Sequence, residues 1–178
     1  SSSGLYAAIG ILAALLERER SGVGQWVQVS LLHTQIAMMD FQVARYLNEG
    51  QVPTQEGNNH PTTTPMGMFK AADGLFNVGV AGDGMWRAFC TAMGQPQWLM
   101  DPNYSTADSR SNHRARLNDE VQKLFLTHNV NHWVELLNGM GVPAGPVYTV
   151  PEMLEDPQVR HLKVVASAPV TGGIQRRF

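Results

Sequence analysis

The first fifty residues alternate between long apolar stretches and short polar breaks. Residues 5–16 are apolar on nearly every side and are followed by alternating glutamate and arginine at 17–20, which predicts a buried helix with a solvated last turn. Residues 25–30 alternate weakly and are rich in β-formers, so we predict a strand there. A second helix is predicted over 31–48, with Ser30 as its N-cap and Gly50 just past its end.

The apolar segments after residue 50 are shorter and are typical of a small mixed domain. Residues 68–71 and 75–80 are β-prone and are joined around Asp73-Gly74, which is a strong hairpin signal. The elements predicted after this hairpin are helices over 85–93, 110–128, 130–138 and 150–155, a turn of helix at 96–100, extended chain at 142–147 and a β-prone tail over 162–170.

These elements predict an α+β small domain over residues 67–160, built from a short antiparallel sheet with helices. Residues 1–50 form a separate segment of helices and strand, and residues 51–66 form a proline-containing loop that links the two. We expect residues 161–178 to return toward the first segment. Because residues 1–50 cannot bury their apolar helices alone, we expect them to belong to a larger body or to pack against a partner.

Composition and charge argue against several classes of function. A formal net charge of −2 over 178 residues offers no basic footprint for nucleic acid. No apolar run reaches the length that spans a membrane. Cys90 is the only cysteine, so no internal disulfide forms, and we expect residence in the cytoplasm or in a mitochondrial or peroxisomal matrix. The chain opens on Ser1 inside a predicted helix start, and we expect a segment upstream of it.

Isolated reactive side chains give weak signals. No histidine has a metal-binding spacing; His128 and His132 are four residues apart, but we expect the break at 129–131 to separate them. Cys90 lies in an apolar helix, where a buried inert thiol is favoured over a nucleophile. Asp40 sits between apolar neighbours as a possible acid or base, although a surface or domain-contact aspartate is the favoured interpretation.

The loop before the hairpin is the richest polar segment. Residues 57–66 read Gly-Asn-Asn-His-Pro-Thr-Thr-Thr-Pro-Met, so donors and acceptors are held between two stiffening prolines. Such a loop on a scaffold is a common place for binding residues, but an ordinary connector whose Asn and Thr bond their own backbone has the same composition. The residues alone leave both interpretations open.

Several segments read together resemble one family. They are residues 4–15, 21–30, 57–61 with Pro65 and Phe69, 73–74, 141–147 and 156–159. In this order they are similar to the signature segments of class III CoA-transferases, a family that includes formyl-CoA, crotonobetainyl-CoA and succinyl-CoA transferases and the α-methylacyl-CoA racemases. The resemblance covers nearly the whole chain.

The resemblance implies a fold and a mechanism. Members carry an N-terminal doubly wound α/β domain that binds most of the CoA, to which residues 1–50 would belong, and they form interlocked homodimers. Their nucleophilic aspartate precedes the segment that matches residues 1–4, so we expect it immediately before Ser1 and no catalytic residue within this chain. In the family that carboxylate takes CoA from an acyl-CoA through an anhydride and holds it as an aspartyl-CoA thioester.

The resemblance also implies the substrate-binding residues. The loop matches the family's mobile flap over the reacting thioester, and Asn59 and His60 are expected to contact the acyl group. The six substrate-binding residues expected are Gly57, Asn58, Asn59, His60, Pro61 and Thr62. The loop lacks the repeated glycines of some transferases and resembles the branch acting on dicarboxylic or carnitine-type acyl groups. The implied partners are an acyl-CoA and a small carboxylic acid, with coenzyme A as substrate and no cofactor or metal.

Two alternatives remain beside CoA transfer. An acyl-CoA racemase would use residues of the N-terminal half, which this chain does not contain. The chain alone could also be a non-catalytic fragment, because neither the nucleophile nor a glycine-rich nucleotide-binding turn lies within it.

Overall fold

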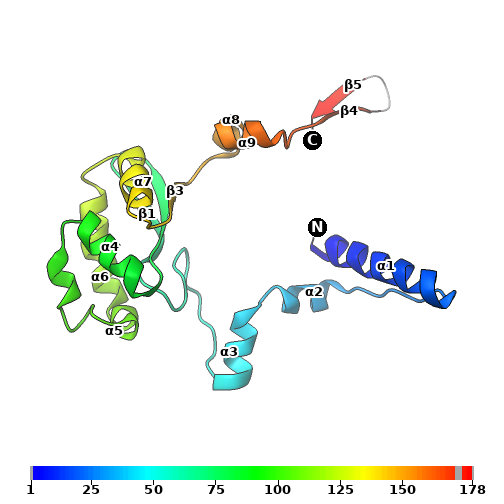
Figure 1. Ribbon diagram of the computed structural model, residues 1–178, viewed down its shortest axis with the longest axis horizontal. Coiled ribbons are helices and arrows are strands. Elements are labelled where there is room, and N and C mark those ends of the chain that lie inside the picture. The colour runs from blue at the N-terminus through cyan, green and yellow to red at the C-terminus, as the bar shows by residue number, and fades with distance from the viewer. Residues whose placement is uncertain (1, 171–173, 178) are drawn as a thin grey trace. The chain divides into compact units, whose positions relative to one another are not determined.

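The computed structural model describes residues 2–170 and 174–177 (Figure 1). The chain divides into two compact units, one ending at Gln55 and the other beginning at Glu56. Within the part that the structure describes, no helix is both long enough and apolar enough to cross a membrane.

The first unit contains three helices, α1 (Ser2–Ser21), α2 (Leu31–Ala37) and α3 (Phe41–Glu49). The continuous helix predicted over 31–48 is wrong, because the chain breaks at Asp40, where φ is 47°. The last bonds of α2 are i→i−3 bonds, so its final turn tightens before the chain changes direction. Aspartate tolerates positive φ better than most residues, so no glycine or proline marks this break in the sequence.

The strand predicted over 25–30 is also wrong. These residues are extended but belong to no strand in the described part of the chain. The segment packs by side chains against α1, where Val27 lies 2.8 Å from the position of a Cβ at Gly10. A β-prone sequence becomes a strand only when a neighbouring strand accepts and donates its backbone hydrogen bonds.

Helix α1 carries an exposed apolar face. Residues 5–16 were expected to be buried, but none of the residues of α1 is buried in this chain. Leu5, Ile9, Leu12 and Leu16 share one helical face and are each 63–67% exposed. The first unit does not bury its apolar helices by itself, as the sequence predicted.

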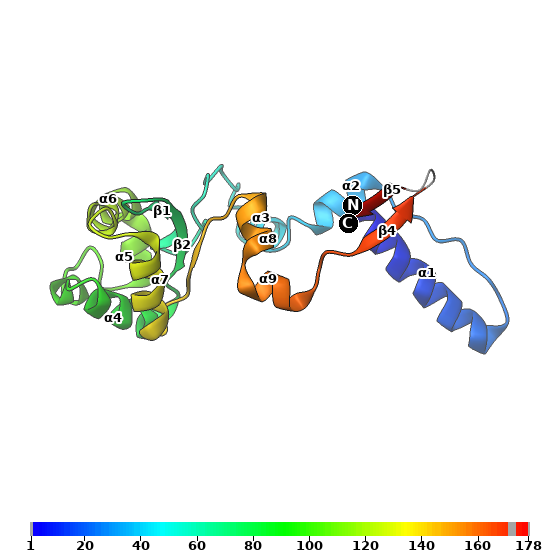
Figure 2. The same ribbon diagram turned by 90° about the horizontal axis from the view of Figure 1, so that it is seen from above.

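The second unit contains a three-stranded antiparallel sheet with helices, which confirms the predicted small α+β domain. The strand order is β1–β2–β3, and helices α4, α6 and α7 cover one face of the sheet (Figures 1 and 2). Its elements are β1 (Met66–Lys70), β2 (Leu75–Gly79), α4 (Gly82–Ala92), a 3-10 turn η1 (Pro96–Leu99), α5 (Ala107–Asn112), α6 (Arg114–Phe125), α7 (Val130–Gly139) and β3 (Ala144–Pro146).

The chain ends in shorter elements. They are α8 (Val150–Glu155), α9 (Pro157–Leu162), β4 (Ser167–Val170) and β5 (Ile174–Arg177), the last two forming an antiparallel pair. The helix predicted over 150–155 is confirmed. The β-prone tail predicted over 162–170 is confirmed for β4, whereas Leu162 is the last residue of α9. Asp156 caps the N-terminus of α9 by accepting from two backbone N–H groups.

The helix predicted over 110–128 is divided in two. Thr106 and Ser109 form a reciprocal capping box that starts α5 three residues earlier than predicted. His113 then leaves helical geometry, at φ −107° and ψ 23°, before α6 begins. The Arg110 guanidinium is buried, lies 4.8 Å from the Trp86 ring centroid and donates to the Tyr104 carbonyl, which fixes α5 on the domain.

A cluster of aromatic rings forms the core of the second unit. The Phe125 ring of α6 meets Phe69, Phe76 and Trp133 edge to face at centroid distances of 4.8–5.2 Å. The Trp133 indole donates to the Phe125 carbonyl at 2.8 Å, so the N–H of this indole is satisfied inside the core. The ring of Phe125 therefore joins α6 to strands β1 and β2 and to helix α7.

Cys90 lies inside the same core. Its side chain is fully buried on α4, and burial raises the pKa of the thiol to about 12. The favoured interpretation of a buried thiol is confirmed.

We expect Phe125→Ala to lower the free energy of unfolding by about 3–5 kcal/mol, because it leaves a cavity among the rings of Phe69, Phe76 and Trp133. Urea unfolding followed by tryptophan fluorescence measures this change. The matched control is the neighbour Leu126, which is 45% exposed; Leu126→Ala should cost less than about 1 kcal/mol. Equal losses from the two variants would contradict the core assigned to Phe125.

A thiol with a pKa of about 12 stays protonated at pH 8, so Cys90 should resist alkylation by iodoacetamide in the folded chain. In urea the pKa returns to its ordinary value and the same thiol should be alkylated within minutes. Intact-mass spectrometry reads both states. Rapid alkylation of the folded chain at pH 8 would show that this part of the core opens.

Candidate functional site

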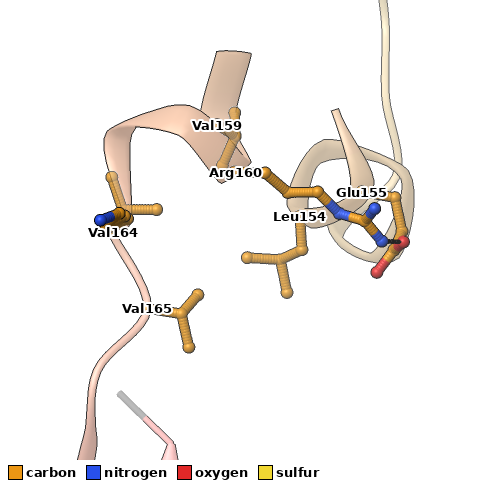
Figure 3. Close-up of a pocket in the computed structure, with 7 residues that line it drawn as sticks. Leu154, Glu155, Val159, Arg160, Val164 and Val165 are labelled. Atoms are coloured by element: carbon orange, nitrogen blue, oxygen red, sulfur yellow. Dashed lines mark ion pairs between the residues drawn. The ribbon is translucent and has the colours of Figure 1, made fainter. Parts of the chain in front are cut away.

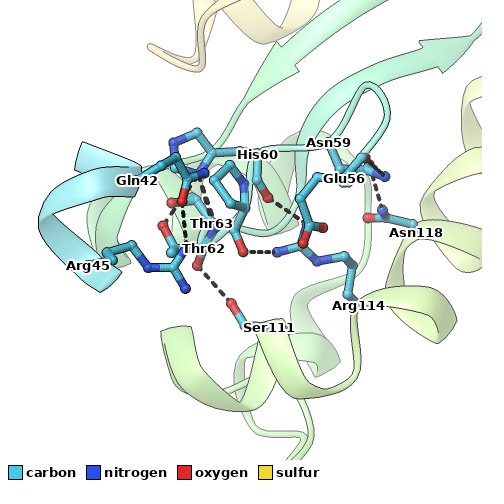
Figure 4. A network of polar contacts seen from close by, with 11 residues as sticks. Gln42, Arg45, Glu56, Asn59, His60, Thr62, Thr63, Ser111, Arg114 and Asn118 are labelled. Carbon is cyan, nitrogen blue, oxygen red and sulfur yellow. Dashed lines mark hydrogen bonds and ion pairs between the residues drawn. The ribbon is translucent and has the colours of Figure 1, made fainter. Parts of the chain in front are cut away.

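The loop preceding β1 folds back onto that strand (Figure 4). The His60 N–H donates to the Met66 carbonyl at 2.9 Å, and the Met68 N–H donates to the Asn58 carbonyl at 3.3 Å. Asn59 forms an isolated bridge with Gly67. These bonds extend the edge of the sheet by a short irregular segment, so the loop has a defined backbone although it contains no helix or strand.

Two glycines allow this path. Gly57 has a φ of 61°, which glycine adopts without steric cost. Gly67 has a φ of 152°, and a Cβ there would lie 2.5 Å from the Asn58 carbonyl oxygen. The close approach of the loop to β1 therefore requires glycine at position 67.

The imidazole of His60 organises the next turn. Its Nδ1 lies 3.2 Å from the backbone nitrogens of both Thr62 and Thr63 and accepts from these N–H groups. An accepting Nδ1 carries no proton, so the neutral ring holds its proton on Nε2. His60, which the sequence predicted as a substrate-binding residue, therefore also fixes the backbone of the loop.

Side chains of α5 and α6 hold the same loop from its other flank (Figure 4). Arg114 donates from one guanidinium nitrogen to the His60 carbonyl at 2.5 Å and from another to the Pro61 carbonyl at 3.0 Å. It also pairs with the Glu56 carboxylate at 3.4 Å. Ser111 donates to the Thr62 carbonyl at 2.8 Å, and Asn118 donates to Asn59 Oδ1 at 3.3 Å.

The structure brings all six sequence-predicted residues together in this one loop. Gly57, Asn58 and Thr62 are exposed, and Asn59, His60 and Pro61 are half-buried. Their role in binding substrate stays a prediction. The loop offers amide, imidazole and hydroxyl groups without a charged side chain between residues 57 and 64, so it is suited to hydrogen bonding.

Sequence reasoning missed the residues that hold the loop. Ser111, Arg114 and Asn118 are spaced as one helical stripe, but a polar stripe on an amphipathic helix is the ordinary solvated face. The sequence around Glu56 likewise did not indicate that this residue contacts the loop. Only the fold shows that this stripe meets a loop 49 to 59 residues earlier in the chain.

The other reactive groups stand apart from this loop. Asp40 is an exposed residue at the start of α3 and its side chain makes no cap hydrogen bond. The expected separation of His128 and His132 is wrong, because their rings stack at a centroid distance of 4.1 Å. Asn129 accepts from the His132 N–H as the N-cap of α7, which turns the chain tightly enough to bring the rings together. Among the described residues no group of three or more His, Cys, Asp or Glu could hold a metal.

Two of the hollows on the described part of the second unit bear on where the site lies. The larger, about 650 Å³, adjoins α8 and α9 and is lined mainly by apolar side chains with the Arg160–Glu155 ion pair (Figure 3). It shares no residue with the loop, and we do not place the site there. The smaller, about 350 Å³, includes Met66 and the strand β3 in its lining and so adjoins the end of the loop.

We expect ¹⁵N NMR of ring-labelled protein to show His60 as the Nε2–H tautomer at a pH where the imidazole is neutral. The reason is that Nδ1 accepts from two backbone N–H groups in the loop. His113 provides an internal comparison, since its Nδ1 lies 2.9 Å from the Ser109 carbonyl and must donate there. A His60 ring protonated on Nδ1 would contradict this loop geometry.

Comparison with known proteins gives a consistent answer. The sequence pattern of CoA-transferase family III matches residues 1–175. Two relatives are 34% identical: the succinyl-CoA–D-citramalate CoA-transferase of Chloroflexus aurantiacus, over 88% of this chain, and the succinyl-CoA:mesaconate CoA-transferase of Haloarcula marismortui, over 93%. The chain spans 39% and 41% of their respective lengths.

A solved structure has a similar fold. The orthorhombic crystal form of Rv3272 from M. tuberculosis matches all of this chain with a TM-score of 0.84 at 25% identity, and 46% of that protein is covered. Together the sequence pattern, the curated relatives and this structure establish that the chain belongs to CoA-transferase family III.

Proposed function

We propose that this chain is the C-terminal portion of an enzyme that moves CoA from a dicarboxylic acyl-CoA to a second carboxylic acid. The observation that carries the proposal is the family match over residues 1–175 together with relatives named for succinyl-CoA, D-citramalate and mesaconate. All three of these acids are dicarboxylic. The neutral, hydrogen-bonding loop at residues 57–64 supports an acyl group that carries its own negative charge, because the loop adds no carboxylate to repel it.

The proposed reaction uses an aspartate immediately upstream of Ser1. Its carboxylate attacks the thioester carbonyl and expels CoA thiolate, which leaves a mixed anhydride. The thiolate then attacks the aspartyl carbonyl and releases the donor acid, giving an aspartyl-CoA thioester. Attack by the acceptor carboxylate and return of CoA to the new acyl carbon complete the exchange and regenerate the aspartate.

Helix α1 supports this position for the nucleophile. It begins at Ser2 and has no acidic residue in its first turn. An upstream carboxylate would lie beside the N–H groups at the helix N-terminus, which favour an anion and a developing oxyanion. In this proposal the loop at 57–64 closes over the anhydride and keeps water from hydrolysing it.

The exposed face of α1 supports a larger assembly. Leu5, Ile9, Leu12 and Leu16 require a covering surface, and the relatives are more than twice as long as this chain. In our proposal a doubly wound CoA-binding domain and a second copy in an interlocked homodimer supply that surface.

We expect the isolated 178-residue chain to transfer no CoA between succinyl-CoA and mesaconate, because it contains neither the nucleophile nor most of the CoA site. A polypeptide of family length that contains this chain should form the new thioester, measured by HPLC of the CoA esters. Replacing the upstream aspartate by asparagine should abolish this exchange.

Turnover by the isolated chain would contradict the placement of the nucleophile. Epimerisation at the α-carbon of an acyl-CoA without an acceptor acid, in place of exchange, would instead identify a racemase and overturn the proposed transfer.

A further inference from the structure

Four consecutive loop residues are each held by a side chain from α5 or α6. Asn59 accepts through its side chain from Asn118, and the carbonyls of His60, Pro61 and Thr62 accept from Arg114 and Ser111 (Figure 4). The donors come from 49 to 59 positions later in the chain. We call these three residues, Ser111, Arg114 and Asn118, the loop anchor.

Arg114 makes most of the contacts of the loop anchor. It spans two successive carbonyls and the Glu56 carboxylate at the entrance of the loop. The Arg114 side chain is 18% exposed and that of Glu56 is 30% exposed, so these bonds are largely sheltered from water. Sheltered charge-assisted hydrogen bonds are stronger and less screened than pairs on an open surface.

We propose that Arg114 is a positioning residue that sets the backbone of residues 60–61 and thereby the substrate-facing groups of the loop. The inference rests on the proposed function, since it takes this loop as the cover of the acyl group. Arg114 acts through the two carbonyls it holds, and the contacts to substrate belong to the loop itself.

The geometry calls for arginine in particular. A planar guanidinium presents parallel N–H groups that reach two adjacent acceptors at once, whereas a lysine ammonium is a single point donor on a flexible stem. Arg114→Lys should therefore keep the charge and one carbonyl contact but lose the fixed spacing between residues 60 and 61.

The contact with Glu56 does not by itself explain the arrangement. The ion pair, at 3.4 Å, is the longest of the three contacts of Arg114, and the two carbonyl contacts at 2.5 and 3.0 Å do not need it. Glu56→Gln should therefore disturb the loop less than Arg114→Ala does. The buried core is formed by other residues of α6, namely Leu117, Val121 and Phe125.

Hydrogen exchange of the 178-residue chain tests the positioning step. In Arg114→Ala the backbone amides of residues 60, 62 and 63 should exchange at least about tenfold faster than in the wild type. The matched control is Arg116→Ala: Arg116 lies on the same helix and pairs with Glu120 at 3.0 Å, but its side chain is 61% exposed and makes no hydrogen bond to the loop among the described residues. Unchanged loop exchange in Arg114→Ala, or equal acceleration in Arg116→Ala, would overturn the proposal.

Kinetics in the family-length polypeptide test the consequence. Arg114→Ala should lower kcat/KM by about tenfold to hundredfold and raise the KM of the acceptor acid, with partial recovery in Arg114→Lys. A merely structural loss lowers the number of folded sites and so reduces kcat without changing KM. If Arg114→Ala fails to fold, Arg114→Lys alone carries the test through the same KM shift.

The outcomes separate this inference from the proposed function. Absence of CoA transfer by the wild-type polypeptide would overturn the proposed function, and with it the substrate role given to the loop, while the exchange data would still report whether Arg114 holds it. Normal transfer with an unchanged KM in both Arg114 variants would overturn the inference and leave the proposed function standing.

Discussion

Burial of the Phe125 ring is the interaction on which the second unit depends. The ring is fully buried and meets aromatic side chains from β1, β2 and α7, so a single residue of α6 ties that helix to the rest of the domain. Because aromatic burial supplies a large part of the free energy of folding in a small domain, the position of α6 on the sheet follows from this contact. Val121 and Leu117, one and two turns earlier, extend the same buried face.

Once α6 is fixed, the positions of its polar residues are fixed as well. Gln122 donates to and accepts from the backbone of Lys70, and so satisfies both groups of a residue on the β1 strand. Arg114 and Asn118 meet the loop that leads into β1. The same helix therefore packs the core, pairs with the sheet and holds the candidate site, and packing in one place determines hydrogen bonding in the others.

The first unit presents the opposite situation. Its helices have the apolar faces of a buried structure but no core residue among them, apart from the buried Thr34 of α2. The chain spans about two fifths of the length of its curated relatives, and a domain of that larger size would have the surface needed to cover these faces. The small domain therefore has a core formed by its own contacts, whereas the apolar face of α1 is not covered within this chain.

The sequence by itself determined the hairpin around Asp73-Gly74, the helices α4, α7 and α8, the buried thiol of Cys90 and the family, because each of these follows from local spacing or from ordered motifs. Tertiary structure decided the rest. The 25–30 segment found no strand to pair with, Asp40 and His113 broke two helices through backbone angles that no glycine or proline announces, and Asn129 brought His128 onto His132. The loop residues 57–62 were visible in the sequence as a polar segment. The role of Arg114, which holds this loop, could not be predicted from the sequence. An arginine on a helix surface has the same sequence pattern whether it faces water or two carbonyl groups that the fold brings to it.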